Sequence, residues 1–323
     1  MKPTPEAVAQ TNLWVIILHW NNEADTAACV ESLLHNRVEN ARLTLLVVDN
    51  GTRDDLPRRW QARFDERVKF LRLADNLGYA GGNNHGIRLA LAQGAGLILL
   101  LNNDTTMPVD FLANFIAAAQ RHPAAGIFGC KIFYAEPDDR LWYAGGSLQP
   151  WLGRTRHFGL GRRDRPRFQQ EREVDFVTGC AMLVRPQVFT KIGLLDETLF
   201  LYYEDADFCQ RARRAGIRMR YVPAAMLRHK VGAGAGRNLT SRYLYYQTRN
   251  RYWVMQRGRG RLFRAWLLFL HFFVYSGWRL LYVGLRGARP RLPLMAAIWQ
   301  GCCDGQQRFK SQPDSRSRLK PTC

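Results

Sequence analysis

Short apolar runs of strand length alternate with stretches of helical periodicity over the first 130 residues. Each run is apolar on both faces, as in a buried strand, and each is followed by a segment whose apolar positions recur at helical spacing. Strands are expected at residues 13–18, 43–48, 68–71 and 97–101, and helices at 24–34, 56–64, 84–93 and 109–120. Because strands alternating with helices build parallel sheets, the pattern predicts an α/β fold with a mostly parallel central sheet.

The alternation weakens after residue 130, where the pattern predicts smaller elements. The predictions are a hairpin at 142–148, a polar and mobile Arg-rich excursion at 154–172, strands at 174–178 and 181–184, a helix at 203–215, and strands at 218–222 and 226–229. From residue 238 the periodicity is helical, and the polar residues 311–323 are expected to form a disordered tail.

Positive charge is concentrated at the carboxyl end of the chain. Of the 47 Lys and Arg residues, 17 lie in residues 237–323 beside two acids, which places 15 of the 20 net positive charges there. We therefore expect an α/β domain over residues 1–236, a helical basic segment over 237–310 and the tail over 311–323. Such a segment suits a phosphate-rich partner, either nucleic acid or anionic lipid.

Composition also restricts the class of protein and its compartment. With 47% hydrophobic and 12% aromatic residues, the chain as a whole is globular rather than disordered. Its seven cysteines include no CxxC pair and lie mostly in apolar stretches, which favours a reducing compartment. The first twelve residues lack the charged-then-apolar layout of a signal peptide, so the chain is expected to start in the cytoplasm.

Polar residues cluster where the predicted strands end. Asn21 follows the first strand, Asp49 follows the second, and the sequence Asn102-Asn103-Asp104 follows the fourth. In open α/β sheets, ligands bind at the carboxyl ends of the strands. Asp104 is well placed to hold a divalent cation, since Mg²⁺ and Mn²⁺ prefer oxygen ligands. An Asx turn in which Asp104 caps the next helix explains the same pattern equally well.

A Gly/Asn segment at residues 76–86, with the sequence NLGYAGGNNHG, lies between a predicted strand and a predicted helix. Glycines there allow the backbone to approach a ligand, and the following helix N-terminus favours a phosphate. The spacing differs from the GxGxxG of dinucleotide-binding folds, and a tight strand-to-helix turn accounts for the glycines as well.

An acidic group, Glu204-Asp205-Ala-Asp207, opens the helix expected at 203–215. At 100° per residue, Asp205 shares a face with Phe208 and is expected to point inward, whereas Asp207 shares a face with Arg211 and suits a structural ion pair. An inward acid at a helix start is either a base in a cleft or a residue that interacts with the helix dipole.

Taken together, these segments resemble the family 2 inverting glycosyltransferases of GT-A fold, and most of all the bacterial rhamnosyltransferase-like branch. The resemblance extends over residues 13–235. The matching segments are Asp49-Asn50, residues 76–86, 101–105, 178–185, 193–197, 199–207 and 222–225, and His229.

The resemblance implies roles for individual residues. Asp49 is similar to the carboxylate that reads the nucleotide base or ribose, Asp104 to the last acid of the metal-binding DxD motif, and His229 to a histidine that helps hold the metal or diphosphate in some relatives. Glu204 and Asp205 look like the acidic dyad, with Asp205 as the catalytic base. The expected residues for binding the nucleotide sugar are Asn21, Asp49, Asn76, Gly78, Gly81, Gly82, Asn84 and Asn103.

The resemblance also implies the reaction and its components. A hexose or deoxyhexose such as rhamnose would move, with inversion, from a UDP- or dTDP-sugar to a glycan or polyprenyl-linked acceptor in cell-surface polysaccharide synthesis, with Mg²⁺ or Mn²⁺ as cofactor. The DxD motif has become Asn102-Asn103-Asp104, which removes one carboxylate. A noncatalytic protein that binds nucleotide sugars or polyanions is the alternative.

Residues 265–278 form a run of fourteen uncharged, mostly apolar residues between Arg264 and Arg279. A bilayer span needs about 20 predominantly apolar residues, so the run is marginal for crossing. The flanking arginines suit a helix at an anionic membrane surface, which predicts a peripheral protein on the cytoplasmic face of the plasma membrane. Spanning the membrane and packing on protein are the other two possibilities. We expect no nucleic-acid partner, because no recognised binding motif is present.

Overall fold

The computed structural model describes residues 10–39, 41–52, 59–60, 63–64, 66–231, 240–286 and 291–307. The chain divides into two compact units. The first comprises Met1–Leu148 and Thr155–Gly232, and the second comprises Gln149–Arg154 and Ala233–Cys323. The predicted boundary at residue 236, the predicted tail and most of the helix expected at 56–64 lie outside the described residues.

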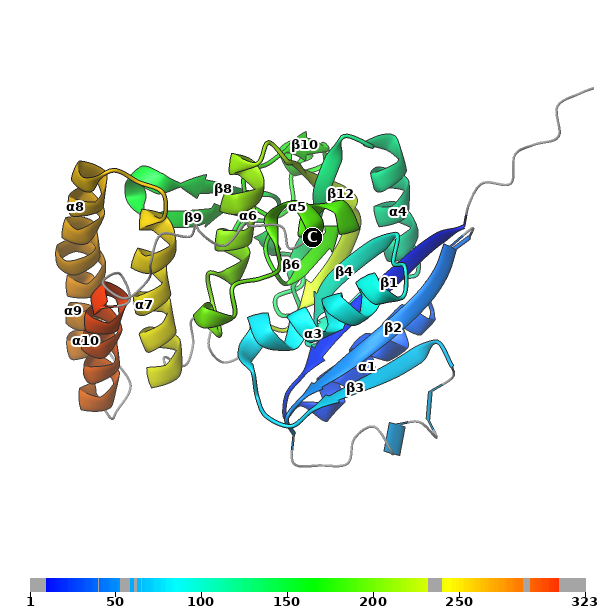
Figure 1. Ribbon diagram of the computed structural model, residues 1–323, viewed down its shortest axis with the longest axis horizontal. Helices are drawn as coiled ribbons and strands as arrows, with labels where there is room; N and C mark the ends of the chain where they lie inside the picture. The colour runs from blue at the N-terminus through cyan, green and yellow to red at the C-terminus, as the bar shows by residue number, and fades with distance from the viewer. Residues whose placement is uncertain are drawn as a thin grey trace, which may run out of the picture. The chain divides into compact units, whose positions relative to one another are not determined.

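A ten-stranded sheet runs through the described part of the first unit (Figure 1). Its main path follows the order β10 (Arg172–Glu173), β12 (Arg218–His229), β6 (Ala125–Tyr134), β11 (Ala181–Val184), β4 (Leu97–Asn102), β1 (Thr11–His19), β2 (Ala41–Asn50) and β3 (Val68–Leu73). Beside this path, β5 (Thr105–Thr106) pairs with β12 and β7 (Leu141–Tyr143) pairs with β6.

Four neighbouring strands, β4, β1, β2 and β3, are parallel, and the sheet then mixes directions because β11 runs antiparallel between β4 and β6. The cores of β1, β2 and β4 are fully buried, as the apolar runs predict, whereas the edge strand β3 is only partly buried. The predicted α/β fold with a mostly parallel sheet and a helical C-terminal segment is confirmed.

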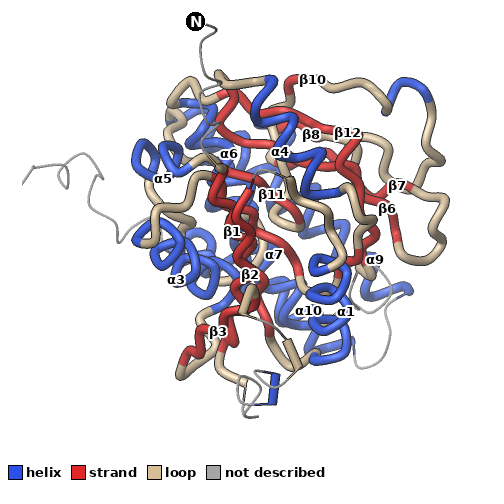
Figure 2. Tube along the Cα trace, turned by 90° about the vertical axis from the view of Figure 1, so that its right-hand side faces the viewer, coloured by secondary structure: helices blue, strands red, loops and turns tan. Residues whose placement is uncertain are grey.

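Helices cover both faces of the parallel part of the sheet. The α-helices described in this unit are α1 (Glu23–Leu34), α3 (Gly78–Ala92), α4 (Phe111–Arg121), α5 (Pro186–Ile192) and α6 (Glu204–Arg214). In Figure 2, α3 lies on one side of β1 and β2, and α1 lies on the other. Contacts join α3 to β1 and β2, α4 to β12, and α5 to α6.

The predicted start of α3 was wrong, because the helix begins at Gly78 and includes most of the Gly/Asn segment. Its glycines permit close packing on the sheet. A Cβ at Gly82 would come within 2.4 Å of Leu18 Cδ1, and one at Gly86 within 2.7 Å of Ile16 Cγ2. Sheet packing therefore accounts for these two glycines without a phosphate ligand.

Several small elements after residue 130 also differ from the predictions. The hairpin at 142–148 is absent, because β7 pairs with β6 while β8 (Gly146–Gln149) pairs with β9 (Arg154–His157). Residues 174–178 form no strand apart from one isolated bridge at Phe176, and the two strands expected at 218–229 are one strand, β12, with a bulge.

The Arg-rich segment at 154–172, expected to be mobile, is held by hydrogen bonds within the first unit. It contains β9, and Lys131, which is buried, donates hydrogen bonds to Asp164 and Gln169 at 2.7 Å. Burying a lysine requires an acidic partner, so Asp164 fixes this segment. Hydrophobic patterning does not reveal a constraint of this kind.

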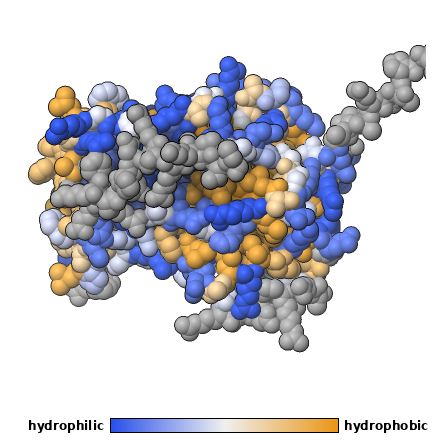
Figure 3. All heavy atoms as spheres, viewed as in Figure 1, coloured by the Kyte–Doolittle hydropathy of each residue, from blue (hydrophilic) through white to orange (hydrophobic). Residues whose placement is uncertain are grey.

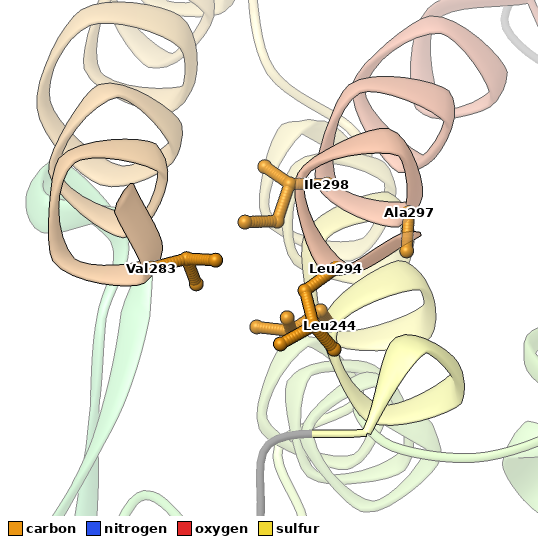
Figure 4. Close-up of a cluster of buried hydrophobic side chains, with 5 residues drawn as sticks. All are labelled: Leu244, Val283, Leu294, Ala297 and Ile298. Atoms are coloured by element: carbon orange, nitrogen blue, oxygen red, sulfur yellow. The ribbon is translucent and has the colours of Figure 1, made fainter. Parts of the chain in front are cut away.

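The second unit is helical. Its elements are α7 (Ser241–Gln256), α8 (Arg261–Phe269), the π-helix η4 (Leu270–Ser276), α9 (Gly277–Arg286) and α10 (Arg291–Gln307). Figure 4 shows side chains from α7, α9 and α10 pointing toward one another in a small core of Leu244, Val283, Leu294, Ala297 and Ile298. Among the described residues, the continuous helix Arg261–Leu285 alone is long and apolar enough to cross a membrane, a criterion that a helix packed on protein can also satisfy.

Candidate active site

Two of the acids expected to act in catalysis, Glu204 and Asp205, lie in the first turn of α6, after a turn with unusual backbone geometry. Phe200, Tyr202 and Tyr203 have φ angles of 61°, 67° and 70°, in the left-handed region that non-glycine residues seldom occupy. Each costs on the order of 1–3 kcal/mol and persists only where surrounding contacts impose it. One such contact is the hydrogen bond that Tyr79 N donates to Phe200 O at 2.6 Å.

Asp205 is held against the turn that precedes β11. Its Oδ2 accepts a hydrogen bond from Gly179 N at 3.0 Å, and its Oδ1 accepts one from Ala206 N at 2.7 Å. Burial raises the pKa of this carboxyl, while these bonds and one to the Thr178 side chain lower it. Asp205 keeps partial exposure, so its carboxylate combines a fixed orientation with access for a substrate proton.

Glu204 has a different environment from its neighbour. It is 6% exposed, and its buried Oε2 has no hydrogen-bond partner among the residues that the structure describes. Burial, followed by the charge of Asp205, raises the pKa of Glu204 well above its usual value. Burial thus favours the protonated form of Glu204 more strongly, whereas Asp205 is partly exposed and accepts two backbone hydrogen bonds, so Asp205 is the better proton acceptor.

Replacing Glu204 with Gln should stabilise the protein increasingly as the pH rises. A carboxyl whose folded-state pKa is raised stabilises the fold below its unfolded pKa, and this contribution is lost as the pH rises through the folded pKa. Gln does not ionise and avoids that loss. The thermal midpoint of Glu204→Gln relative to wild type should therefore be higher at pH 8 than at pH 5. An identical difference at both pH values would mean that the pKa of Glu204 is not raised in the folded protein.

Asp207 is also buried, although the helical wheel singled out Asp205 as the inward acid. It is 2% exposed, and Arg211 Nε lies 2.7 Å from its Oδ2. The same guanidinium donates hydrogen bonds to the Ile192 and Leu194 carbonyls, which fixes the end of α5 against α6. The predicted structural ion pair with Arg211 is confirmed.

Asp104 and His229 come together from distant parts of the sequence. Asp104 follows β4, His229 ends β12, and His229 Nε2 lies 3.1 Å from Asp104 Oδ1. The backbone supports this approach, because Lys230 N donates to Asp104 O at 2.9 Å and His229 pairs with Thr105 of β5. The indole of Trp142 packs edge-on against the imidazole of His229, with the two ring centres 4.8 Å apart.

This pair fits a divalent cation that takes its remaining ligands from a substrate. The donors are one carboxylate oxygen and one imidazole nitrogen on a buried histidine, whose Nδ1 has no hydrogen-bond partner within the described residues. In the described part of the chain, no group of three or more His, Cys, Asp or Glu residues is arranged to hold a metal. Mg²⁺ commonly binds through one or two carboxylates plus phosphate oxygens, so two protein ligands suffice.

The acid after β2, Asp49, is fully buried and only partly satisfied. Its Oδ1 accepts hydrogen bonds from Thr52 N at 3.0 Å and Thr52 Oγ1 at 2.6 Å, and its Oδ2 has no hydrogen-bond partner among the described residues. Arg72 Nε lies 3.8 Å from Oδ2, too far for a good hydrogen bond. A buried acceptor oxygen with a free lone pair at a strand end suits a ribose hydroxyl or a base N–H.

Strand register places the predicted donor-binding residues along one edge of the sheet. His19 at the end of β1 pairs with Asp49 of β2, and Leu18 pairs with Asn102 of β4. Asn103 donates from Nδ2 to Thr26 Oγ1 at 2.7 Å, and Thr26 Oγ1 lies 2.7 Å from His19 Nδ1. Beyond β1, Asn21 is exposed and has a φ of 55°.

Two other predicted binding residues are engaged within the protein. Asn84 donates to the Leu195 carbonyl and to Glu197 Oε1, both at 2.9 Å, and accepts from Leu195 N at 3.1 Å. Asn76 Oδ1 accepts from Asn50 Nδ2 at 3.1 Å and from Gly78 N at 2.8 Å. Both side chains fix the main chain, so we leave them out of the proposed donor site.

The three predicted glycines also have structural roles. Gly78 has a φ of 73°, and a Cβ there would come within 2.3 Å of Phe200 O. A Cβ at Gly81 would come within 2.7 Å of Leu77 Cβ, and Gly82 packs against Leu18. We leave all three glycines out of the donor site as well.

Tyr79 is a site residue that the sequence did not single out. Its hydroxyl donates to Gly179 O at 2.5 Å, while the N–H of Gly179 bonds Asp205. A Cβ at Gly179 would come within 2.9 Å of the Tyr79 hydroxyl, so the glycine is needed for this approach. An aromatic residue within the glycine-rich sequence NLGYAGG indicates a specific contact for Tyr79, but the sequence does not show that its partner is Gly179, 100 residues away.

The dyad and the Asp104 turn lie at the same edge of the sheet. Asn102 N donates to Cys180 O at 2.9 Å, next to the peptide that binds Asp205, and β11 pairs with β4 from Ala181 onward. One edge of the first unit therefore carries a partly exposed carboxylate, a carboxylate–imidazole pair and, at the end of β2, a buried acid. This combination suits a diphosphate ligand and a proton transfer.

Comparisons with known proteins agree with this geometry. The family profile described as "Glycosyltransferase like family 2" matches residues 10–256. The mannosyltransferase PcManGT from Pyrobaculum calidifontis, solved with GDP-Man and Mn²⁺, superposes with a TM-score of 0.55 at 13% identity, covering 93% of this chain and 87% of that one. At such low identity the likeness shows the fold.

Three curated relatives are similar in sequence. A hexosyltransferase of low-salt glycan biosynthesis from Haloferax volcanii is 27% identical over 75% of this chain and 74% of its own length. An N-acetylglucosaminyl-diphospho-decaprenol L-rhamnosyltransferase from Mycobacterium tuberculosis is 28% identical over 62% and 70%, respectively. An uncharacterized protein of Sinorhizobium fredii is 31% identical over 65% of this chain, which spans 23% of that protein's length. The chain therefore belongs to glycosyltransferase family 2 and is a glycosyltransferase of GT-A fold.

Proposed function

We propose that this glycosyltransferase moves a hexose or deoxyhexose, such as rhamnose, from a nucleotide diphosphate sugar to a glycan or polyprenyl-linked acceptor with inversion at the anomeric carbon. One observation carries the proposal: the contact between Asn102 and Cys180 joins the Asp205 site to the Asp104 turn at one sheet edge. A single carboxylate positioned as a base is what one in-line displacement requires.

The residues divide the chemistry between them. Asp49, with Asn21 and Asn103 nearby, would bind the nucleoside, and Asp104 with His229 would hold Mg²⁺ or Mn²⁺. When bound, the cation would neutralise charge that develops on the departing diphosphate. Asp205 accepts the proton of the acceptor hydroxyl as the oxygen of that hydroxyl attacks the anomeric carbon and the nucleoside diphosphate leaves. Gly179 N–H and Ala206 N–H keep the carboxylate oriented for that transfer.

The names of the relatives support the substrate classes. The mycobacterial relative is named for L-rhamnose transfer to a decaprenyl-linked acceptor, and a Shigella flexneri relative is named a dTDP-rhamnosyl transferase. We therefore propose a UDP- or dTDP-sugar as donor. We also propose that the protein works in the cytoplasm, peripherally on the inner face of the plasma membrane, where a polyprenyl-linked acceptor is accessible.

A panel of nucleotide sugars tests the donor proposal. UDP-, dTDP- and GDP-sugars, each with Mn²⁺, should be compared for protection against thermal unfolding. A ligand at 100 times its Kd adds about 2.7 kcal/mol of stability, so the correct donor should stand out clearly. Protection by one donor without transfer to any acceptor would favour a noncatalytic sugar-nucleotide binding protein. Lack of protection by every donor would contradict the proposed site.

A further inference from the structure

An apolar stripe runs along the helix formed by α8, η4 and α9 in the second unit. Steps of three or four residues keep its members on one face of an α-helix. The step of five from Phe273 to Trp278 crosses the π-helix η4, whose wider turn brings residues i and i+5 to the same face. All members are at least 43% exposed: Leu262, Trp266, Phe269, Phe273, Trp278, Leu281 and Leu285.

The segment Gln149–Arg154 extends this stripe from a distant part of the sequence. The Trp151 carbonyl accepts from Trp266 Nε1 at 2.9 Å, and the Leu152 carbonyl accepts from the Tyr275 hydroxyl at 2.6 Å. The helix thus fixes the backbone of the segment, yet Trp151 remains 70% exposed, with its ring edge-on to Phe263. We call the stripe together with Trp151 and Leu152 the apolar face. In Figure 3 the helices of this unit lie at the left, where hydrophobic side chains occur among hydrophilic ones.

Residues of the same helix outside the stripe pack on protein and contact cations. Arg279 donates to Thr248 Oγ1 of α7 at 3.0 Å, and the guanidinium of Arg251 lies 3.1 Å from the ring centre of Tyr275. If this helix crossed a bilayer, α7 would accompany it and carry its arginines to hydrocarbon depth, which is strongly disfavoured. A helix lying parallel to the surface avoids this cost and still buries its apolar face.

Charge identifies the partner. Residues 240–286 contain nine arginines and no Asp or Glu, so the apolar face belongs to a strongly cationic unit. Helices that combine a large apolar face with cations lie in the interface of anionic membranes. We propose that the apolar face lies in the plane of an anionic phospholipid bilayer at the boundary of headgroups and acyl chains, with Trp151 as an anchor from outside the helices. This refines the membrane partner proposed above and holds whichever sugar is transferred.

Thiol labelling tests the orientation in the full-length protein. A Cβ at Gly260 or Gly284 would meet nothing within 4 Å, so a cysteine is tolerated at each position. The two positions are about 36 Å apart along the helix, more than the roughly 30 Å of a hydrocarbon core. In sealed inside-out membrane vesicles, Gly260→Cys and Gly284→Cys should both react with an impermeant maleimide above the background of the native thiols. Reaction of one position only after detergent is added would show a spanning helix and overturn the proposal.

Vesicle binding tests the face itself. Phe273→Glu and Trp151→Ala should each lower partitioning onto phosphatidylglycerol vesicles by roughly tenfold, since each removes a large exposed apolar side chain that the bilayer would bury. Leu160→Glu, at a 52% exposed leucine of the first unit, is the matched control and should bind as wild type. Donor-induced thermal protection should persist in all three variants, which separates this proposal from the catalytic one. Unchanged partitioning of both face variants, or wild-type binding to single-stranded nucleic acid in preference to vesicles, would overturn the proposal.

Discussion

Asp205→Asn is expected to lower kcat by roughly 10² to 10⁴ while leaving donor binding close to wild type. The substitution removes the proton acceptor without adding bulk. In the wild type Gly179 N donates to Asp205 Oδ2, and the amide oxygen of the asparagine can accept the same hydrogen bond. Transfer should be measured at saturating donor, and donor binding by thermal protection. Because burial raises the pKa of Asp205, wild-type activity should fall as the pH drops through that raised pKa.

Glu204→Gln is the matched control for this experiment, since it makes the same chemical change at the neighbouring position. Glu204 is buried and burial raises its pKa, so the amide is a close substitute for the protonated form that burial favours. We expect this variant to keep substantial activity. Near wild-type turnover in Asp205→Asn together with an inactive Glu204→Gln would move the base to Glu204.

Asp104→Ala is expected to reduce kcat/KM by about 10² or more in the presence of Mn²⁺. Asp104 is the carboxylate beside His229, and Asn102 and Asn103 can offer only neutral amide oxygens to a cation. Stabilisation of a leaving diphosphate by a metal is worth several kcal/mol, which corresponds to this loss. Chelation of wild type with EDTA should have a similar effect, reversed by added Mn²⁺.

Asp138→Ala serves as the control, because this carboxylate is mostly exposed and is 3.7 Å from Arg228. It should respond to EDTA as wild type does. If EDTA leaves wild-type transfer unchanged, the metal assignment is wrong, and basic side chains must balance the diphosphate charge instead.

The strands and the edge that carries the site could be predicted from sequence, because fully apolar runs such as that of β4 have few alternatives to burial in a sheet. The strand-end position of Asp49 and Asp104 followed from those runs. The glycines of the segment at 76–86 were harder to interpret. The sequence does not distinguish a glycine that makes room for a ligand from one that makes room for a neighbouring strand. Gly82 makes room for Leu18 of β1.

Contacts across long sequence separations could not be predicted. The approach of His229 to Asp104 depends on β12 pairing with β5, and the link from Tyr79 through Gly179 to Asp205 joins three segments that are far apart in the chain. The burial of Asp207 escaped the helical wheel because α5 covers that side of α6, where Arg211 bonds the Ile192 and Leu194 carbonyls. Periodicity describes one helix at a time and does not specify what packs against it.

The anomeric configuration of the product, determined by NMR with the donor that the thermal panel identifies, tests the central claim most directly. Asp205 as the base of a single displacement predicts a glycosidic bond of opposite configuration to that in the nucleotide sugar. A product that retains the donor's configuration would contradict this account, because retention requires a different course from one in-line attack assisted by Asp205.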